Sequence, residues 1–208
     1  MTVTKISRSR RIPGRMYAEL DTGETLRVPE GIALDFALCV DKTLSAQEYG
    51  ELCARCATAL AKERALRVLG SRQMSREEMV SRLVSLGETE ETAEDTAEWL
   101  ADIGLIDDEV YASAIAESYT RRGWGERKIR DEFFRRRVPR QYWNAAIEAQ
   151  RGADMESDAP ALTMLERKLG GQLPDRDARR KISGQLVRRG FSWDEINDAF
   201  RAYLERIE

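Results

Sequence analysis

The stretch from Asp107 to Ala149 reads DDEVYASAIAESYTRRGWGERKIRDEFFRRRVPRQYWNAAIEA, and it predicts three short helices in succession. Apolar side chains recur in it at spacings of three and four residues, which is typical of helices with one buried face. Gly123 and Gly125 separate the first helix from the second, and Val138-Pro139 ends the second, because a residue before proline disfavours helical backbone angles. The predicted buried positions are Tyr111, Ala112, Ile115 and Tyr119 in the first helix, Ile129, Phe133 and Phe134 in the second, and Trp143 and Ile147 in the third.

This three-helix unit occurs three times along the chain with low sequence identity. Shifts of 50 and 53 residues superpose the landmarks of the second and third helices, and a stop signal follows each second helix. Periods of this length indicate helical units that stack to bury a continuous core. The matched second-helix positions are Met79, Ile129 and Ile182, then Leu83, Phe133 and Leu186, and finally Gly87, Arg137 and Gly190.

The sequence predicts a mainly α fold: tandem three-helix repeats in an elongated array, preceded by a small N-terminal β-hairpin. Short extended runs flank a turn at Gly23, and capping boxes begin predicted helices after Ser45, Ser75 and Ser192. Residues 150–160 have no helical periodicity and are interpreted as a linker. We expect a β-hairpin segment at 1–29, a helical connector at 30–58, and repeats at 59–106, 107–150 and 151–208.

Composition argues against most enzyme classes. The 208 residues include no histidine, so His-based catalytic triads and mixed Cys/His zinc sites are excluded. Cys53 and Cys56 have redox-motif spacing, but the segment is Ala-rich and helical, which favours ordinary thiols. Phosphate-binding loops and nucleophile elbows are absent. We therefore expect no catalytic residues, metal or cofactor, and the lack of a membrane span or secretory signal favours a cytoplasmic protein.

Charge is distributed unevenly between the repeats. From Ser75 to Glu109, twelve acidic residues face two basic ones, whereas from Arg121 to Arg140 nine basic residues face three acidic ones. An excess of six positive charges favours contact with phosphate or an acidic partner. Part of the run could instead be a salt-bridged face, with Glu132 reaching Arg136 and Asp131 reaching Arg135, or could neutralise the acidic repeat. The candidate contact residues are Arg121, Arg122, Arg127, Lys128, Arg130, Arg135, Arg136, Arg137, Arg140, Lys181, Arg188 and Arg189.

A second basic cluster lies near the N-terminus. Lys5, Arg8, Arg10, Arg11 and Arg15 fall within the predicted hairpin segment. Such a cluster can contact nucleic acid, but a solvated tail explains it equally well. We also expect that the repeats do not need this segment to complete their own apolar stripes.

Several strings, taken in order, resemble the RecX family of RecA regulators over nearly the whole chain. ALRVLGSRQMSREEMVSRLVSLG (65–87) is similar to the family's opening pattern, and GLIDD (104–108) followed by VYA (110–112) resembles its joint between repeats. RRGWG (121–125) with KIRDE (128–132) resembles its basic segment, and LVRRGF (186–191) is similar to its third repeat. Arg137 stands where glycine is typical of the family, and Trp124 replaces a commoner small or basic residue.

The resemblance implies a monomeric protein that binds the RecA filament on single-stranded DNA and inhibits its ATPase and strand exchange. It also implies a place in homologous recombination, DNA repair and the SOS response, with weak direct DNA contact possible. Two other classes stay open. One is a direct DNA-binding protein made of helix-turn-helix-like units, against which the net charge of −3 argues. The other is a metal-dependent hydrolase using Asp107, Asp108 and Glu109, for which helix capping is the better explanation.

Overall fold

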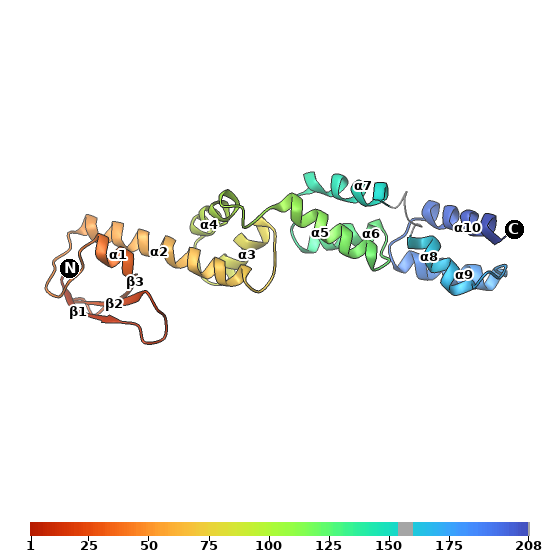
Figure 1. The fold of residues 1–208 in the computed structure, drawn as a ribbon. Helices are drawn as coiled ribbons and strands as arrows, with labels where there is room; N and C mark the ends of the chain where they lie inside the picture. The colour runs from red at the N-terminus through yellow and green to blue at the C-terminus, as the bar shows by residue number, and fades with distance from the viewer. Residues whose placement is uncertain (154–159, 208) are drawn as a thin grey trace. The chain divides into compact units, whose positions relative to one another are not determined.

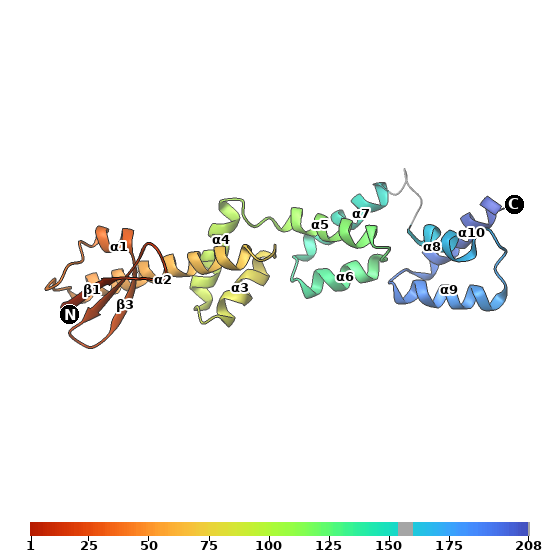
Figure 2. The same ribbon diagram turned by 60° about the horizontal axis from the view of Figure 1, so that its bottom comes forward.

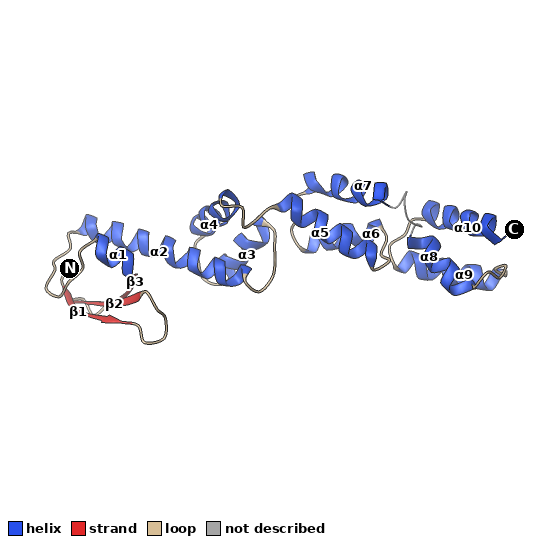
Figure 3. Cartoon of the chain, viewed as in Figure 1, coloured by secondary structure: helices blue, strands red, loops and turns tan. Residues whose placement is uncertain are grey.

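The computed structural model describes residues 1–153 and 160–207, so most of the predicted 150–160 linker lies outside the described residues. The described chain is mainly helical, with a small sheet at its N-terminal end (Figures 1 and 3). It forms two compact units, Met1–Arg72 with Met79–Leu100, and Gln73–Glu78 with Ala101–Glu208. The elements are β1 (Val3–Arg8), β2 (Arg15–Leu20), β3 (Thr25–Pro29), α1 (Glu30–Asp35), α2 (Ala46–Leu69), α3 (Arg76–Ser85), α4 (Glu90–Asp102), α5 (Asp108–Arg121), α6 (Glu126–Arg135), the 3₁₀ turn η1 (Arg140–Tyr142), α7 (Trp143–Ala153), α8 (Pro160–Leu169), α9 (Arg176–Arg188) and α10 (Trp193–Ile207).

The predicted hairpin is confirmed, and a third strand extends it to an antiparallel sheet in the order β1-β2-β3. Because side chains alternate across a strand, β2 has one apolar face and one polar face. Ala18 and Leu20 are buried on the first face, while Arg15, Tyr17 and Glu19 lie on the second. The apolar face packs with the first half of α2 in a single cluster (Figure 2). That cluster comprises Val3, Ala18, Leu20, Val28, Ala33, Leu44, Leu52 and Cys56.

Helix α2 is one continuous helix and crosses the proposed boundary at 58/59. Its start is a complete capping box: the Ser45 hydroxyl accepts from the Glu48 backbone N–H at 3.1 Å, and the Glu48 carboxylate accepts from the Ser45 N–H at 2.9 Å. It continues to Leu69 without the break that the sequence left open near Cys56. Burial raises the pKa of the Cys56 thiol to about 11, so Cys56 is a protonated core side chain.

The middle repeat consists of α5, α6 and α7, with α5 packed against both of the others. Asp107 caps α5, as its carboxylate accepts from the backbone N–H groups of Glu109 and Val110. The predicted stripes are confirmed at eight positions: Tyr111, Ala112, Ile115, Ile129, Phe133 and Ile147 are buried, and Tyr119 and Trp143 pack against them. Phe134 was predicted to extend the stripe, and this is wrong: it lies off the apolar face of α6 and is 71% exposed.

The last repeat consists of α8, α9 and α10, in which α8 packs against α10. The hydroxyl of Ser192 accepts from the Glu195 N–H, and the carboxylate of Glu195 accepts from the Ser192 N–H, which confirms the capping box before α10. Gly170 and Gly171 both have positive φ and end α8, as the sequence indicated. The core of this repeat comprises Ala161, Leu162, Met164, Leu165, Ile182, Leu186, Phe191, Ile196, Ala199, Phe200 and Tyr203.

The second helices α3, α6 and α9 end in the same hydrogen-bonded turn. In each, a residue with positive φ is followed by a residue whose N–H bonds back five positions: Glu88 to Leu83, Val138 to Phe133, and Phe191 to Leu186. This is the Schellman arrangement, which normally uses glycine because a Cβ disfavours positive φ. Gly87 and Gly190 follow that rule, whereas Arg137 adopts φ +52° with a side chain. The three turns confirm the alignment of the repeats at the level of individual hydrogen bonds.

Candidate basic interface

The twelve candidate cations lie at the end of α5, along α6 and the turn after it, and on α9. Their environments differ, and the difference decides which of them are available to a partner. Some hold buried acidic groups, some pair with exposed acids of their own helix, and some cover aromatic rings or helix ends.

Arg135 and Arg136 both bind the buried carboxylate of Glu132. Arg135 approaches through Nε at 2.8 Å and Nη2 at 2.5 Å, and the Nε of Arg136 is 2.8 Å away. Burial by itself would raise the pKa of Glu132, but hydrogen bonds from these two arginines and from Tyr119 outweigh it and lower the pKa to about 2. Glu132 is therefore ionised at neutral pH within the α5–α6 interface. Arg136, whose side chain is only 24% exposed, belongs mainly to the repeat itself.

Other candidates pair with acids on the outside of the helices. Arg130 binds Glu126 at 2.7 Å and the Asn144 side chain at 2.9 Å. Lys128 lies 3.5 Å from Asp131. The alternative in which Asp131 reaches Arg135 is wrong, because Arg135 binds the buried carboxylate of Glu132 instead. Two further candidates have longer ion pairs, Arg121 with Glu117 at 3.3 Å and Arg137 with Glu77 at 3.5 Å.

Arg189 links the last two repeats. Its Nη1 donates to the backbone carbonyls of Arg122 and Gly123, which are the exposed acceptors at the end of α5, and its guanidinium lies over the Trp124 ring. The Gly125 N–H donates to the Arg189 carbonyl at 2.9 Å. Arg189 therefore has a structural role. Nothing in this geometry supports the prediction that Arg189 contacts a partner.

Two glycines permit this backbone contact. A Cβ on Gly125 would lie 2.5 Å from the carbonyl carbon of Gly190, and one on Gly190 would lie 2.7 Å from the Lys128 nitrogen. The Arg127 N–H also donates to the Gly190 carbonyl at 3.1 Å, so carbonyls at the end of α9 satisfy N–H groups at the start of α6. From sequence, Gly125 was predicted only to separate two helices. The glycine pair at 123 and 125 was the available signal for a close backbone approach.

The remaining candidates are more accessible. Arg122 and Arg140 are exposed and lie over the rings of Tyr119 and Trp143. Among the described residues, Arg127, Lys181 and Arg188 are cations whose side chains have no ion pair. All three are exposed. With the 53-residue shift, Lys181 and Arg188 match Lys128 and Arg135, so the second helices of both repeats carry cations at the same two positions.

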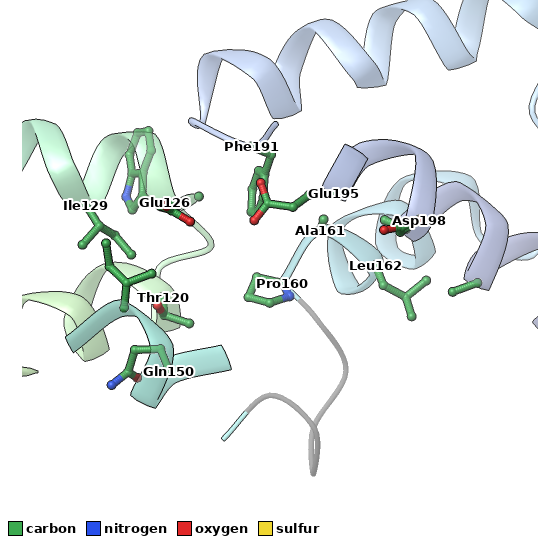
Figure 4. Close-up of a pocket in the computed structure, with 15 residues that line it drawn as sticks. Thr120, Glu126, Ile129, Gln150, Pro160, Ala161, Leu162, Phe191, Glu195 and Asp198 are labelled. Carbon is green, nitrogen blue, oxygen red and sulfur yellow. The ribbon is translucent and has the colours of Figure 1, made fainter. Parts of the chain in front are cut away.

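An apolar hollow of about 430 Å³ lies between the middle and last repeats (Figure 4). Phe191 and Pro160 lie on one side of it and Ile129 and Gln150 on the other. The carboxylates at its edge already have partners: Glu126 binds Arg130, Glu195 caps α10, and Asp198 lies 3.3 Å from Arg201. This arrangement provides no free acid–base pair.

Two of the three acidic residues considered for a metal-dependent hydrolase, Asp107 and Asp108, have structural partners. Asp107 caps α5, and the Asp108 carboxylate accepts from the Arg76 backbone N–H at 2.9 Å. Burial raises the pKa of Asp108, which makes it a poorer cation ligand. Within residues 1–153 and 160–207, no group of three or more Asp, Glu or Cys side chains has the geometry to hold a metal ion.

Two family models match the repeats in order. Residues 107–147 match the second three-helix domain of RecX, and residues 157–200 match the third. A regulatory protein RecX of Xanthomonas axonopodis pv. citri (strain 306) is 33% identical over 144 residues, which cover 69% of this chain and 87% of that relative. The chain belongs to the RecX family. A regulatory protein RecX of Escherichia coli (strain SE11) is 30% identical over 162 residues, covering 73% of this chain and 96% of its own length.

Solved RecX structures have the same fold. A crystal structure of regulatory protein RecX superposes with a TM-score of 0.67 at 23% identity, covering 95% of this chain and 98% of the other. RecX from Lactobacillus salivarius gives a TM-score of 0.62 at 22% identity over 71% of this chain and 96% of its own. The family is one of regulatory proteins. Of the helices described, none is both long and apolar enough to cross a membrane.

Proposed function

We propose that this RecX protein binds the RecA filament on single-stranded DNA and suppresses the filament's ATPase and strand-exchange activities. Membership in a family of proteins named as regulators carries the proposal. With it we propose a monomeric, cytoplasmic, non-catalytic protein without cofactor that acts in recombination, repair and the SOS response. We also propose a division into segments at 1–29, 30–58, 59–106, 107–150 and 151–208, with α2 continuous across the boundary at 58/59.

The second helices of the last two repeats are the proposed contact surface. Lys181 and Arg188 are seven residues apart on α9 and therefore lie on the same side of that helix. The core side of the helix is formed by Ile182, Ser183 and Leu186, so the two cations stand off the packed face. Lys128 and Arg135 occupy the same positions on α6. Cations at regular helical spacing are suited to phosphate groups or to acidic side chains of the filament.

Suppression of RecA turnover is the direct test. The single-stranded-DNA-dependent ATPase of RecA is measured on preformed filaments at low salt with increasing amounts of this protein. We expect turnover to fall toward zero, while the protein alone hydrolyses no ATP and cleaves no DNA. Unchanged turnover at stoichiometric excess would contradict the proposal.

The contact surface is tested with a variant that leaves the structural ion pairs intact. Lys181→Ala/Arg188→Ala removes two exposed cations without acid partners, and Arg167→Ala/Lys168→Ala on α8 removes two exposed charges outside the proposed surface. Filament binding is titrated at several salt concentrations for both variants. If both cations contact phosphate, the first variant lowers the log–log salt slope by about 1.4 units, at about 0.7 per contact on a single strand. If the salt dependence of filament binding has the same slope for both variants, Lys181 and Arg188 of α9 do not contact the filament.

Direct DNA binding is the competing function, because three-helix units with a basic helix resemble helix-turn-helix modules. Co-sedimentation separates the two. The RecA proposal predicts strong retention with RecA–DNA filaments and weak retention with naked duplex. Tight duplex binding without RecA would favour the competing function.

A further inference from the structure

The first unit contains a basic hollow that is separate from the proposed contact surface. It has a volume of about 460 Å³ and is formed by the loop between β1 and β2 together with the polar face of the sheet. Its lining contains no acidic residue and consists of Ser9, Arg10, Arg11, Ile12, Arg15, Tyr17 and Arg27. We propose that this hollow binds single-stranded nucleic acid, with arginines on the phosphates and Tyr17 against a base.

The sheet register places the aromatic ring beside a cation. Tyr17 and Arg27 are directly opposite each other on β2 and β3, so their side chains lie on the same face as neighbours. Arg15 lies two residues before Tyr17 on β2, so its side chain is on the same face of the sheet. The opposite face of the sheet is occupied by the core that packs on α2. The polar face is therefore available to a ligand without disturbing the core.

The loop has a built turn that presents two arginines. The Ser9 hydroxyl accepts from the backbone N–H groups of Arg11 and Ile12 at 3.3 and 3.1 Å. Arg10 and Arg11 are exposed at this turn. Among the described residues, Arg10, Arg11 and Arg27 have no ion pair, hydrogen bond or ring contact through their side chains. These three guanidinium groups are free to bind an anion.

Neighbouring ion pairs fix the inner edge of the site. Arg15 pairs with Glu63 of α2, and its side chain is only 13% exposed. It therefore forms part of the wall of the hollow and offers little free charge to a ligand. A smaller hollow of about 150 Å³ adjoins the first, because Arg15 and Arg27 line both. Arg64 and Arg67 of α2 line this second hollow, where Glu63 is its acidic residue. Arg67 pairs with Glu63 and Arg64 with Glu88, so the unpaired positive charge extends from the loop along the sheet as far as Arg27.

A nucleic acid strand fits this chemistry better than an acidic peptide. Guanidinium groups bind phosphate oxygens through paired N–H donors, and a ring beside them offers a stacking surface that any base can use. A tyrosine ring in the lining of the hollow adds nothing to the binding of a chain of carboxylates. A strand is also narrow enough to lie against a single loop and one sheet face.

The test uses the full-length protein and a fluorescent oligothymidylate in the absence of RecA, so its result is independent of the proposed regulation. Binding is followed by fluorescence anisotropy at several salt concentrations. Arg10→Ala/Arg11→Ala/Arg27→Ala is compared with Lys5→Ala/Arg8→Ala/Arg82→Ala, an equal loss of charge from exposed residues outside both hollows. We expect the first variant to lower the log–log salt slope by about two units, at about 0.7 per phosphate contact, and the control to retain the wild-type slope.

Tyr17→Leu isolates the stacking contribution, because leucine keeps the bulk of the side chain and removes the ring. We expect affinity for the oligonucleotide to fall by between about fivefold and about a hundredfold, with an unchanged salt slope. Poly-glutamate at equal charge concentration serves as competitor and should displace the strand poorly. Equal binding by the two triple variants, an inert Tyr17→Leu, or displacement by poly-glutamate as effective as by unlabelled strand would each overturn the proposal.

Discussion

The arginines of α6 and those around the β1–β2 loop are equally charged but have different environments. Arg135 and Arg136 share one buried carboxylate, so half of their combined charge is neutralised within the repeat. Arg10 and Arg11 stand on a loop whose hollow contains no acidic residue. The dense basic run that dominates the sequence is thus partly structural. In the N-terminal cluster Lys5, Arg8 and Arg15 are also ion-paired, whereas Arg10 and Arg11 are open. The number of charges in a segment does not reveal how many of them a partner can reach.

The largest effect is expected from removing the scaffold of the N-terminal cluster. Deleting residues 1–29 uncovers Leu52 and Cys56 of α2 and removes Val3, Leu20 and Val28, each of which contributes about 1.5–3 kcal/mol by burial. In contrast to the interpretation from sequence, we expect the first half of α2 to lose helix and the first unit to lose roughly 5 kcal/mol or more. Far-UV circular dichroism and urea unfolding measure both. A helix signal reduced by no more than the short α1 would show that α2 is independent of the sheet.

The next effect tests whether the α6 arginines are structural. Arg135→Ala/Arg136→Ala leaves the Glu132 carboxylate without a cation; because Arg135 is largely exposed and water can replace part of the lost bonds, we expect a loss of about 1–3 kcal/mol. Chemical denaturation gives the loss, and adding Glu132→Gln to the double variant should recover part of it. A loss of unfolding free energy below about 1 kcal/mol would show that neither arginine is needed for the stability of the repeat.

How far the sequence could predict this structure follows from the same residues. Helical periodicity identified the repeats, and the positions of Ile129 and Phe133 as core were right because burial follows the helical spacing. Periodicity could not place Phe134, which is one residue outside the stripe, or choose between Asp131 and Glu132 for Arg135. Those choices depend on which carboxylate the neighbouring α5 buries. The hollow around Arg27 was equally hidden, because strand register brings Arg27 to Tyr17 from ten residues away.

A smaller, pH-dependent effect isolates the Glu132 cluster. Its pKa is about 2 in the folded protein, below the ordinary value of 4.5. A lowered folded pKa gives stability that is complete above the unfolded pKa and is lost as pH falls from about 4.5 toward 2. Urea unfolding between these pH values should show this loss in wild type, and Glu132→Gln should remove that component of the slope. If wild type and Glu132→Gln show the same pH dependence of the unfolding free energy, the pKa of Glu132 is the same in the folded and the unfolded protein.

The smallest effect on stability is expected from removing the unpaired arginines of the N-terminal hollow. Arg10→Ala/Arg11→Ala/Arg27→Ala removes exposed side chains without partners, so unfolding free energy should change by no more than about 0.5 kcal/mol. Thermal and urea unfolding of this variant beside wild type provide the measurement. A loss above about 2 kcal/mol would reveal a structural role and make the two clusters alike.

The joint between Gly125 and Gly190 has a consequence for how such a chain can diverge. Main-chain atoms make the contact: the Gly125 and Arg127 N–H groups bind the Arg189 and Gly190 carbonyls. Apart from the two glycines and Arg189, whose side chain also donates to the Arg122 and Gly123 carbonyls, the joint imposes little on the side chains around it. Substitutions can then make the outward surface of one repeat acidic and that of another basic, while the packing of the repeats against each other stays unchanged. A module's partner preference can drift in this way without a new fold having to arise.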